Sequence, residues 1–198
     1  GINTLPGPTV YSGNTASAHS LRPGNAVGAH GGLEILSGAA VNATGLDVAN
    51  VAGSFGTVNF YGGTQHTIQY LCPGFRGTGV VNMYDGYIRV TNSIRIAYYS
   101  TSTNSYLNLY GGTISAPTLS MRREGNPTGW LNITDGVLLL DGDKRSVVQP
   151  YLDNGWILVP NERYELVFEY NGASYPGVTA LYTFYDLLDM IPRNHSTV

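Results

Sequence analysis

Asparagines and aromatic residues recur at a regular spacing along this chain, and they are its best candidates for ligand chemistry. The asparagines occupy matching positions in four similar segments, at Asn59, Asn82, Asn108 and Asn132. Aromatic residues lie two positions after them, at Tyr61, Tyr84 and Tyr110, and two positions before them, at Tyr106 and Trp130. Aromatic rings pack on the C–H faces of sugars, and amides both donate to and accept from hydroxyl groups. The pattern therefore favours binding of a neutral, hydroxyl-rich ligand.

A repeat sets the spacing of these residues. Five segments share the order apolar, polar, apolar, variable, and then a corner that ends in glycine: 33–38, 58–63, 81–86, 107–112 and 131–136. The closing glycines of successive segments are 23 to 26 residues apart. Self-similarity at a fixed period of this length is typical of a solenoid, in which equivalent residues of successive repeats lie above one another.

Each repeat contains three short strands. Strict alternation predicts the first, as in 107–109, and the Gly-Gly or Asp-Gly pair that follows predicts a corner with positive φ. A second strand follows, for example 87–90, and a third alternates at 46–48, 68–70, 94–96 and 119–121. Three strands and three corners in about 24 residues predict an all-β fold, a parallel β-helix of about five coils. An antiparallel β-sandwich is the alternative, but it would not repeat residue types at fixed positions.

The repeat predicts one structural domain with a cap at each end. Residues 1–30 are irregular and contain Pro and Gly, which predicts an N-terminal cap over the open sheet edge. The coils span 31–143, and 144–184 form a C-terminal cap. In that cap, strands at 164–170 and 178–184 flank an Asn171-Gly172 turn and predict a β-hairpin. Residues 185–198 are interpreted as a tail or linker. The first residues do not resemble a signal peptide, so we expect this domain to be part of a larger multidomain secreted protein.

Stacking turns equivalent positions into columns. The apolar positions of the first strand point inward, in one column of Leu33, Val58, Val81, Leu107 and Leu131 and another of Ile35, Phe60, Met83, Leu109 and Ile133. The outward positions predict a binding face of Trp130, Tyr106, Tyr110, Tyr84, Tyr61, Asn108, Asn132 and Asn82, with Glu34 in the first asparagine position. Asparagine and tyrosine ladders also stabilise solenoids by bonding to and stacking on themselves. A purely structural role is therefore the alternative, although an outward Trp on a polar face is harder to explain by structure alone.

The third strands predict a second face with charged residues. Asp47, Gln69, Arg95 and Ser120 form its outward column, with Arg89, Arg122 and Arg123 nearby. Lyases and hydrolases that cleave acidic polysaccharides need clustered carboxylates for metal binding or for acid and base catalysis. The sequence provides no such cluster, because Asp85 and Asp135 occupy corner positions where Gly also fits. Pairing with an arginine is the expected role of Asp47.

Composition limits the partners further. Only 12% of residues are charged, the net charge is −3 and there is no basic run, which argues against nucleic acid and against an anionic membrane as partners. No apolar stretch is long enough to span a bilayer. Cys72 is the only cysteine, so it has no intrachain disulfide partner and is expected to be buried. No cofactor is expected, although Asp141 and Asp143 could contribute to a calcium site if further oxygen ligands were near.

These repeats resemble the β-helix repeats of bacterial surface and secreted proteins, including autotransporter-type passengers. The stretch 151–157, Tyr-Leu-Asp-Asn-Gly-Trp-Ile, resembles the closing segment of repeat regions attached to bacterial polysaccharide-degrading enzymes. The nearest functional analogue is a family of carbohydrate-binding modules that are directed at xylan and have a right-handed parallel β-helix fold, so the resemblance implies an all-β, right-handed parallel β-helix (β-solenoid). The resemblance, over about residues 30–184, implies a secreted or cell-surface, non-catalytic, monomeric module that binds a plant polysaccharide. A structural stalk or adhesin segment is the first alternative, and a polysaccharide lyase or hydrolase is the second.

Overall fold

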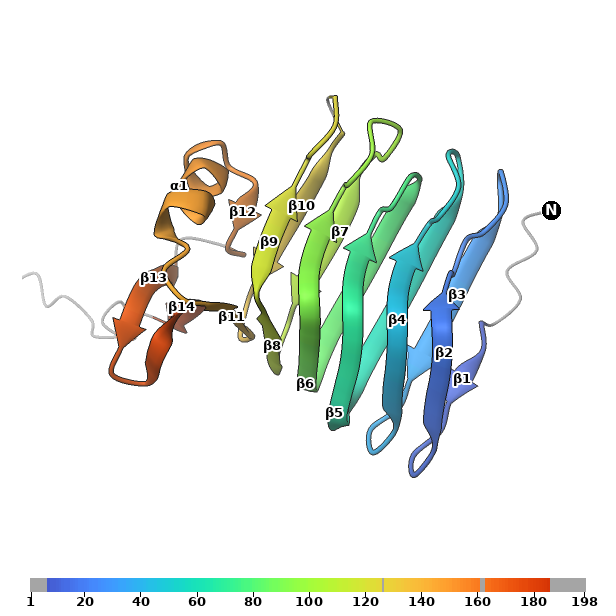
Figure 1. Ribbon diagram of the computed structural model, residues 1–198, viewed down its shortest axis with the longest axis horizontal. Coiled ribbons are helices and arrows are strands. Elements are labelled where there is room, and N and C mark those ends of the chain that lie inside the picture. The colour runs from blue at the N-terminus through green and yellow to red at the C-terminus, as the bar shows by residue number, and fades with distance from the viewer. Residues whose placement is uncertain (1–6, 126, 161–162, 186–198) are drawn as a thin grey trace, which may run out of the picture.

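The computed structural model describes residues 7–125, 127–160 and 163–185. It is a parallel β-helix of about six turns, and its coils lie side by side along the long axis of the molecule (Figure 1). Each coil contributes a strand to each of up to three faces. β5 (Phe55–Pro73) and β6 (Thr78–Ile96) are long enough to bend around two corners and so contribute to all three. The predicted all-β parallel β-helix is confirmed.

We call the first face the ladder face. It is formed by β1 (Thr9–Val10), β3 (His30–Ile35), the beginnings of β5 and β6, β7 (Ser105–Leu109), β10 (Gly129–Ile133) and β12 (Ile157–Leu158), all parallel. The middle face continues with the first halves of β2 (Thr15–Leu21) and β4 (Ala40–Val48), the centres of β5 and β6, β8 (Thr113–Ala116) and β11 (Val137–Asp141).

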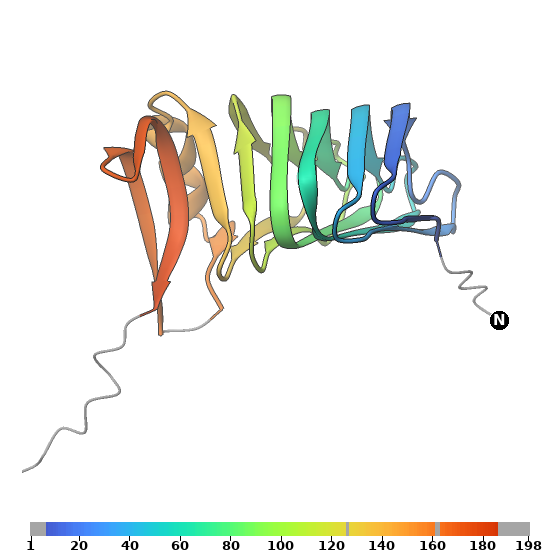
Figure 2. The same cartoon turned by 90° about the horizontal axis from the view of Figure 1, so that it is seen from below.

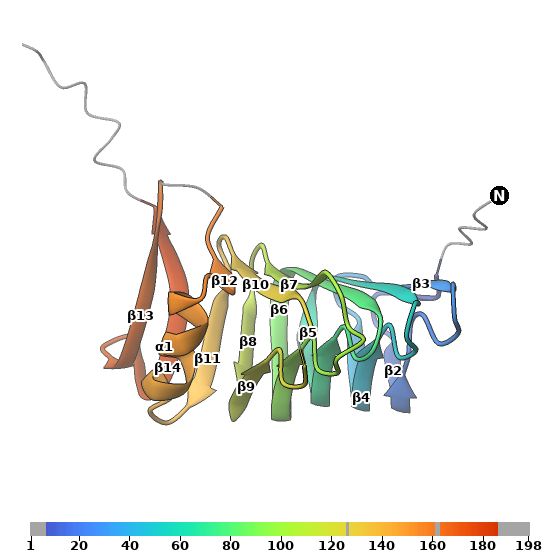
Figure 3. The ribbon, with the colours of Figure 1, turned by 90° about the horizontal axis from the view of Figure 1, so that it is seen from above.

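The third face, which we call the arginine face, is formed by the ends of β2, β4, β5 and β6 and by β9 (Thr118–Met121). Figure 3 shows that β9 lies apart from β7 and β10, on a different side of the coil. Between the arginine face and the next ladder-face strand, the chain runs through loops that include 22–29, 49–54, 74–77, 97–104, 122–125 and 127–128.

The interior is filled by the predicted apolar columns. The register pairs Leu33 with Val58, Val58 with Val81, Val81 with Leu107 and Leu107 with Leu131. All members of both columns are buried, and Phe60 is the largest of the fully buried side chains. Alternation along the first strand therefore identified the core correctly, because every second residue of a strand points to the same side.

Two corners rely on left-handed backbone. The corner after the ladder face has positive φ at Gly38, Gly63, Gly86 and Gly112, with values of 81°, 133°, 93° and 70°. This confirms four of the five predicted glycine corners, whereas Gly136, in the fifth, does not have positive φ. The corner after the arginine face has the same property at Gly24, Ala49, Gly74, Ala97 and Arg122, where only two of the five residues are glycine. Sequence patterns did not identify this second set, because alanine and arginine give no signal of left-handed backbone.

A column of small residues lies at the start of the ladder-face strands. Its members are Gly31, Gly56, Gly79, Ser105 and Gly129. A Cβ added at Gly79 would lie only 2.1 Å from the backbone N of Gly74, and one added at Gly31 would lie 2.1 Å from the backbone N of Gly24. The loops that enter these two coils therefore pack directly on the strand backbone, which requires glycine at positions 31 and 79.

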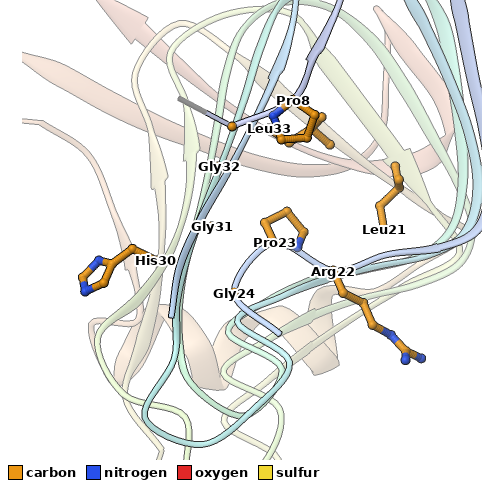
Figure 4. A pocket seen from close by; sticks show the side chains of 10 residues that line it. Pro8, Leu21, Arg22, Pro23, Gly24, His30, Gly31, Gly32 and Leu33 are labelled. Atoms are coloured by element: carbon orange, nitrogen blue, oxygen red, sulfur yellow. The ribbon is translucent and has the colours of Figure 1, made fainter. Parts of the chain in front are cut away.

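The N-terminal cap prediction is wrong for the described residues. Residues 7–30 are not an irregular cover, because β1 and β2 stack on β3 and β4 in parallel register and form a further coil. The repeat was not recognised there because small residues, Ala16 and Ala18, take the place of the larger apolar residues of the other coils. The core at this end opens into a cavity of about 390 Å³ beside Pro8, Leu21, Pro23 and Leu33, whereas His30 points away from it (Figure 4).

The C-terminal cap contains a helix in addition to the predicted hairpin. Helix α1 (Arg145–Asp153) contacts β9 and β12, and Val148 is buried against the core. The hairpin of β13 (Tyr164–Gly172) and β14 (Tyr175–Tyr185) is confirmed, and β14 pairs antiparallel with β11 (Figure 2). Its turn is at Ala173–Ser174 rather than Asn171-Gly172, because Asn171 has positive φ in a bulge and Gly172 still pairs with Tyr175. The predicted tail was 185–198; Tyr185 belongs to β14, and residues 186–198 lie outside the described residues.

His66 is a buried histidine within the apolar column of the middle face. Its Nδ1 accepts a hydrogen bond from the backbone N–H of Val41, 3.1 Å away, and its ring packs edge-on against Phe60. An accepting Nδ1 carries no proton, and burial lowers the pKa of this imidazole. His66 is therefore held in its neutral form.

This histidine predicts a pH dependence of stability. Below pH ~6.5 the unfolded chain binds a proton at His66 that the folded protein does not bind. The free energy of unfolding should therefore fall by about 1.4 kcal/mol per pH unit between pH ~6.5 and the lowered pKa of the folded protein. Urea titrations from pH 5 to 7 measure this slope. The matched variant His66→Gln has no titrating group and should lose it, and an unchanged slope in that variant would contradict the assignment.

Candidate functional site

The asparagine column of the ladder face is a continuous hydrogen-bonded ladder. Each Nδ2 donates to the side-chain oxygen of the preceding coil, from Asn59 to Glu34, Asn82 to Asn59, Asn108 to Asn82 and Asn132 to Asn108, and every bond is 2.7 Å long. Asn108 is buried, and the other members are partly buried. The predicted column and its register are confirmed, and one N–H of each amide is used within the ladder.

Glu34 sets the direction of this ladder. An ionised carboxylate can only accept hydrogen bonds, so Asn59 must turn its Nδ2 toward Glu34. The Oδ1 of Asn59 then faces Asn82, and the same orientation passes to Asn108 and Asn132. At the far end, the Oδ1 of Asn132 is buried and has no partner among the described residues, because Leu158 of β12 follows Asn132 in register.

Three tyrosines form a row beside the ladder. Tyr84 stacks between Tyr61 and Tyr110, with ring centroids 5.1 Å apart on each side and interplanar angles of 4° and 17°. Each of the three side chains is 42% exposed. Their ring faces are turned toward one another along the axis of the solenoid, so solvent meets mainly ring edges and phenol hydroxyls. The pKa of Tyr61 is raised, mainly because its side chain forms a hydrogen bond with the nearby Glu34 carboxylate.

The other aromatic column is covered on its ring faces. Tyr106 stacks on Trp130 at 5.2 Å and 18°. The guanidinium of Arg122 lies 4.9 Å from the Trp130 ring and 4.5 Å from the Trp156 ring, and its Nε donates to the Gly129 carbonyl at 3.0 Å. Burial lowers the pKa of Arg122. The ring faces of Trp130 that the sequence offered for sugar stacking are therefore in contact with Tyr106 and Arg122.

The column predicted for the arginine face is wrong at one position. Cys72, not Gln69, is in register between Asp47 and Arg95, and Ser120 follows Arg95 as predicted. The register shifts between Ile68 and Tyr70, so the third strand of that coil begins at Tyr70 and Gln69 falls at the corner. Cys72 is buried, and burial, followed by the proximity of Asp47, raises the pKa of its thiol. The thiol is protonated and unreactive at neutral pH.

Asp47 pairs with an arginine, as the sequence predicted. The partner is Arg22, whose Nε lies 3.5 Å from Asp47 Oδ2, and Ser20 also donates to that oxygen at 3.3 Å. Arg95 lies close by, with its guanidinium 4.1 Å from the centroid of Tyr70 and 4.8 Å from that of Tyr98. We call the space between these groups the arginine cleft. It has a volume of about 200 Å³ and is lined by His19, Arg22, Asp47, Tyr70, Phe75 and Arg95.

Asp143, one of the two candidate calcium ligands, is paired with Arg145 in the structure. Both carboxylate oxygens of Asp143 accept hydrogen bonds from Arg145, at 2.8 to 3.1 Å, and this pairing lowers the pKa of Asp143 to about 2. Asp141 belongs to β11, which pairs with β14. Within the described ranges, no three His, Cys, Asp or Glu residues are grouped so that they could hold a metal ion.

Comparison with protein-family models, curated protein sequences and solved structures gives no match to this chain. Among the described residues, no helix is long and apolar enough to cross a membrane. The two candidate sites of the protein are therefore the surfaces described above, the tyrosine row with its asparagine ladder and the arginine cleft.

Proposed function

We propose that this protein is a non-catalytic carbohydrate-binding module, and that a neutral plant polysaccharide such as xylan lies along the tyrosine row. The observation that carries the proposal is the exposure of Tyr61, Tyr84 and Tyr110, each 42% accessible on consecutive coils of one face. Large aromatic side chains gathered on a polar surface commonly mark a binding site. We expect the module to belong to a larger secreted or cell-surface protein.

The spacing of the row suits an extended polymer. Neighbouring rings are 5.1 Å apart, close to the length that one sugar unit adds to an extended β-1,4-linked chain. Each coil can then offer one phenol hydroxyl and one ring edge to each sugar. The asparagines beside the row keep a second amide N–H, since only one is used in the ladder. Because the faces of Tyr106 and Trp130 are covered, these two residues would contribute edges at the border of the site.

Affinity electrophoresis tests the proposal directly. The purified protein is run through gels that contain xylan, glucomannan, β-glucan or pectin, and the gel that retards it identifies the ligand. Retardation without release of reducing ends or unsaturated products would support a binding module. Unretarded migration in every gel would contradict it.

A triple Tyr→Phe variant at Tyr61, Tyr84 and Tyr110 separates binding from stability. Phenylalanine keeps the stacked rings but removes three hydroxyls, so we expect affinity for the retarding polysaccharide to fall about tenfold or more, because each neutral hydrogen bond contributes about 0.5–1.5 kcal/mol. The thermal midpoint should stay within a few degrees of the wild type. Tyr87→Phe is the matched control, since its hydroxyl bonds to Ser115 on the middle face at 2.6 Å. Equal retardation of the triple variant and the wild type would exclude this site.

A structural stalk or adhesin segment remains the second candidate, and one observation favours it. The side chains of both columns interact mainly with one another, because the asparagines bond to one another and the tyrosine rings stack on one another. This candidate predicts no retardation in any gel and no functional effect of the Tyr→Phe substitutions.

A further inference from the structure

We propose that the arginine cleft binds a carboxylate group, carried either by a sugar acid or by a small organic acid. This site lies on the arginine face, away from the tyrosine row, and the inference does not depend on the proposed function. Three observations carry it: Arg95 is held in place by its neighbours, Arg22 is paired with Asp47, and a small cleft with an aromatic wall is lined by both arginines.

Arg95 is held with its donor groups ready for a ligand. Its guanidinium lies over the rings of Tyr70 and Tyr98, at 4.1 Å and 4.8 Å, and its Nε donates to Ser93 Oγ at 2.8 Å. The two terminal nitrogens have no hydrogen-bond partner in the described part of the chain. A guanidinium fixed in this way has already lost its side-chain freedom, so it binds a planar carboxylate at a lower entropic cost.

Arg22 approaches the cleft from the first coil. Only its Nε side is engaged, by Asp47 at 3.5 Å, and 47% of its side chain remains accessible. Asp47 is only 13% accessible and also accepts a hydrogen bond from Ser20. Asp47 therefore engages the Nε of Arg22, and the two terminal nitrogens of Arg22 have no ion-pair partner among the described residues.

The size and charge of the cleft define the ligand class. Its volume is about 200 Å³, below the ~300–1,000 Å³ of sites that take drug-sized ligands, so it suits one small group or a single sugar unit. Phe75 and Tyr70 provide an apolar wall for the ring or chain that carries the carboxylate. Asp47 is the only acid among the lining residues, against two arginines.

Further arginines surround this face and reinforce its positive potential. Arg76 lies over Phe75 and Tyr99, and Arg123 bonds to the hydroxyl of Tyr98. Positive charge gathered at a partly enclosed surface concentrates anions near it. A flat bidentate carboxylate matches the fork of a guanidinium better than a spherical anion does.

The test is a titration monitored by isothermal calorimetry with three probes: galacturonate, galactose and acetate. We expect galacturonate to bind and galactose, which lacks the carboxylate, to bind roughly tenfold more weakly or not at all, because charge-assisted hydrogen bonds contribute about 1.5–3 kcal/mol. Acetate distinguishes the two sources of the carboxylate. Binding of galacturonate much tighter than acetate indicates a sugar acid, and equal affinities indicate a small organic acid.

Variants assign the binding to the cleft. Arg22→Gln and Arg95→Gln should each weaken galacturonate binding roughly tenfold, whereas Asp47→Asn should strengthen it, because the competing carboxylate is lost. Arg22 is exposed, so Arg22→Gln should keep the wild-type thermal midpoint. If Arg95→Gln does not fold, the binding affinity of Arg22→Gln still tests the proposal. Arg89→Gln, on the exposed middle face, is the matched control.

Equal binding of galacturonate and galactose would overturn the proposal. So would an equal loss in Arg22→Gln and Arg89→Gln, or tighter binding of inorganic phosphate than of any carboxylate. Retardation by xylan should be unchanged in Arg22→Gln, so failure of this site and failure of the tyrosine row can be told apart.

Discussion

Replacing Gly79 with alanine is expected to lower the free energy of unfolding by about 3 kcal/mol or more. The new Cβ would lie 2.1 Å from the backbone N of Gly74 and 2.8 Å from the Val48 carbonyl oxygen. Both obstacles are backbone, one in the loop that enters the coil and one at the end of β4, so no side-chain rotation can relieve the clash. The loop has to move away from the strand and expose the core beneath it.

Gly32→Ala is the matched control for this substitution. Gly32 also lies in a ladder-face strand, but the nearest atom to an added Cβ is 3.6 Å away, an ordinary contact. We expect its effect to stay within about 0.5 kcal/mol. Urea titrations of both variants measure the difference. If the two substitutions have similar effects, the close packing of loop on strand at Gly79 is not a requirement of the fold.

Asn108→Ala is expected to destabilise the protein by about 2–3 kcal/mol. Asn108 is buried in the centre of the ladder, where it donates to Asn82 and accepts from Asn132. Its removal leaves an acceptor on one side and a donor on the other without their partners. Asn42→Ala is the control, because Asn42 is exposed on the middle face, and its effect should stay below about 0.5 kcal/mol.

Asn108→Asp adds a pH dependence that a simple loss of packing would not show. The introduced carboxylate can accept from Asn132 but cannot donate to Asn82 while it is ionised. Burial raises its pKa above the ordinary ~3.9. The folded state therefore keeps a proton that the unfolded chain loses above pH ~3.9, so the deficit relative to wild type at equal pH should grow as pH rises from ~3.9 toward the raised pKa and shrink as pH falls back to ~3.9. A deficit that does not change between pH 4 and 7 would show that the ladder bonds contribute little.

The sequence predicted the part of the fold that depends on periodicity. Alternation of side chains and a repeated glycine corner are local properties, so the inward columns, the asparagine register and the hairpin could be located without coordinates. The single error in the third strands, Gln69 in place of Cys72, arose at a register shift, which alternation alone cannot reveal.

Features that depend on packing between distant segments could not be predicted. The first coil was missed because Ala16 and Ala18 do not resemble the apolar residues that mark the other coils. Helix α1 follows the end of the repeat, so this segment has no second copy in the sequence from which its structure could be predicted. The arginine cleft combines residues from β2, β4, β5 and β6, and only the register of the coils shows that Arg22 and Arg95 share it.

The same register also decides what the aromatic residues can do. A column of tyrosines was expected to present ring faces to a sugar, but strand spacing in a solenoid brings neighbouring rings within stacking distance of one another. The faces of Tyr84 are therefore covered by Tyr61 and Tyr110. Trp130 was the strongest single candidate for a binding residue, and its position between Tyr106 and Arg122 depends on a left-handed backbone at Arg122.

The common orientation of the asparagine amides gives the ladder face an electrical polarity. Four amide dipoles point the same way, so their partial charges cancel between neighbours and remain at the two ends, as peptide dipoles do in an α-helix. The positive end meets the Glu34 carboxylate, which neutralises it in the way that an acidic residue neutralises a helix N-terminus. The negative end, at Asn132, meets Leu158 and is not neutralised. The rod therefore has a built-in direction, and a further coil added beyond Asn132 would extend the ladder only by presenting a donor to it.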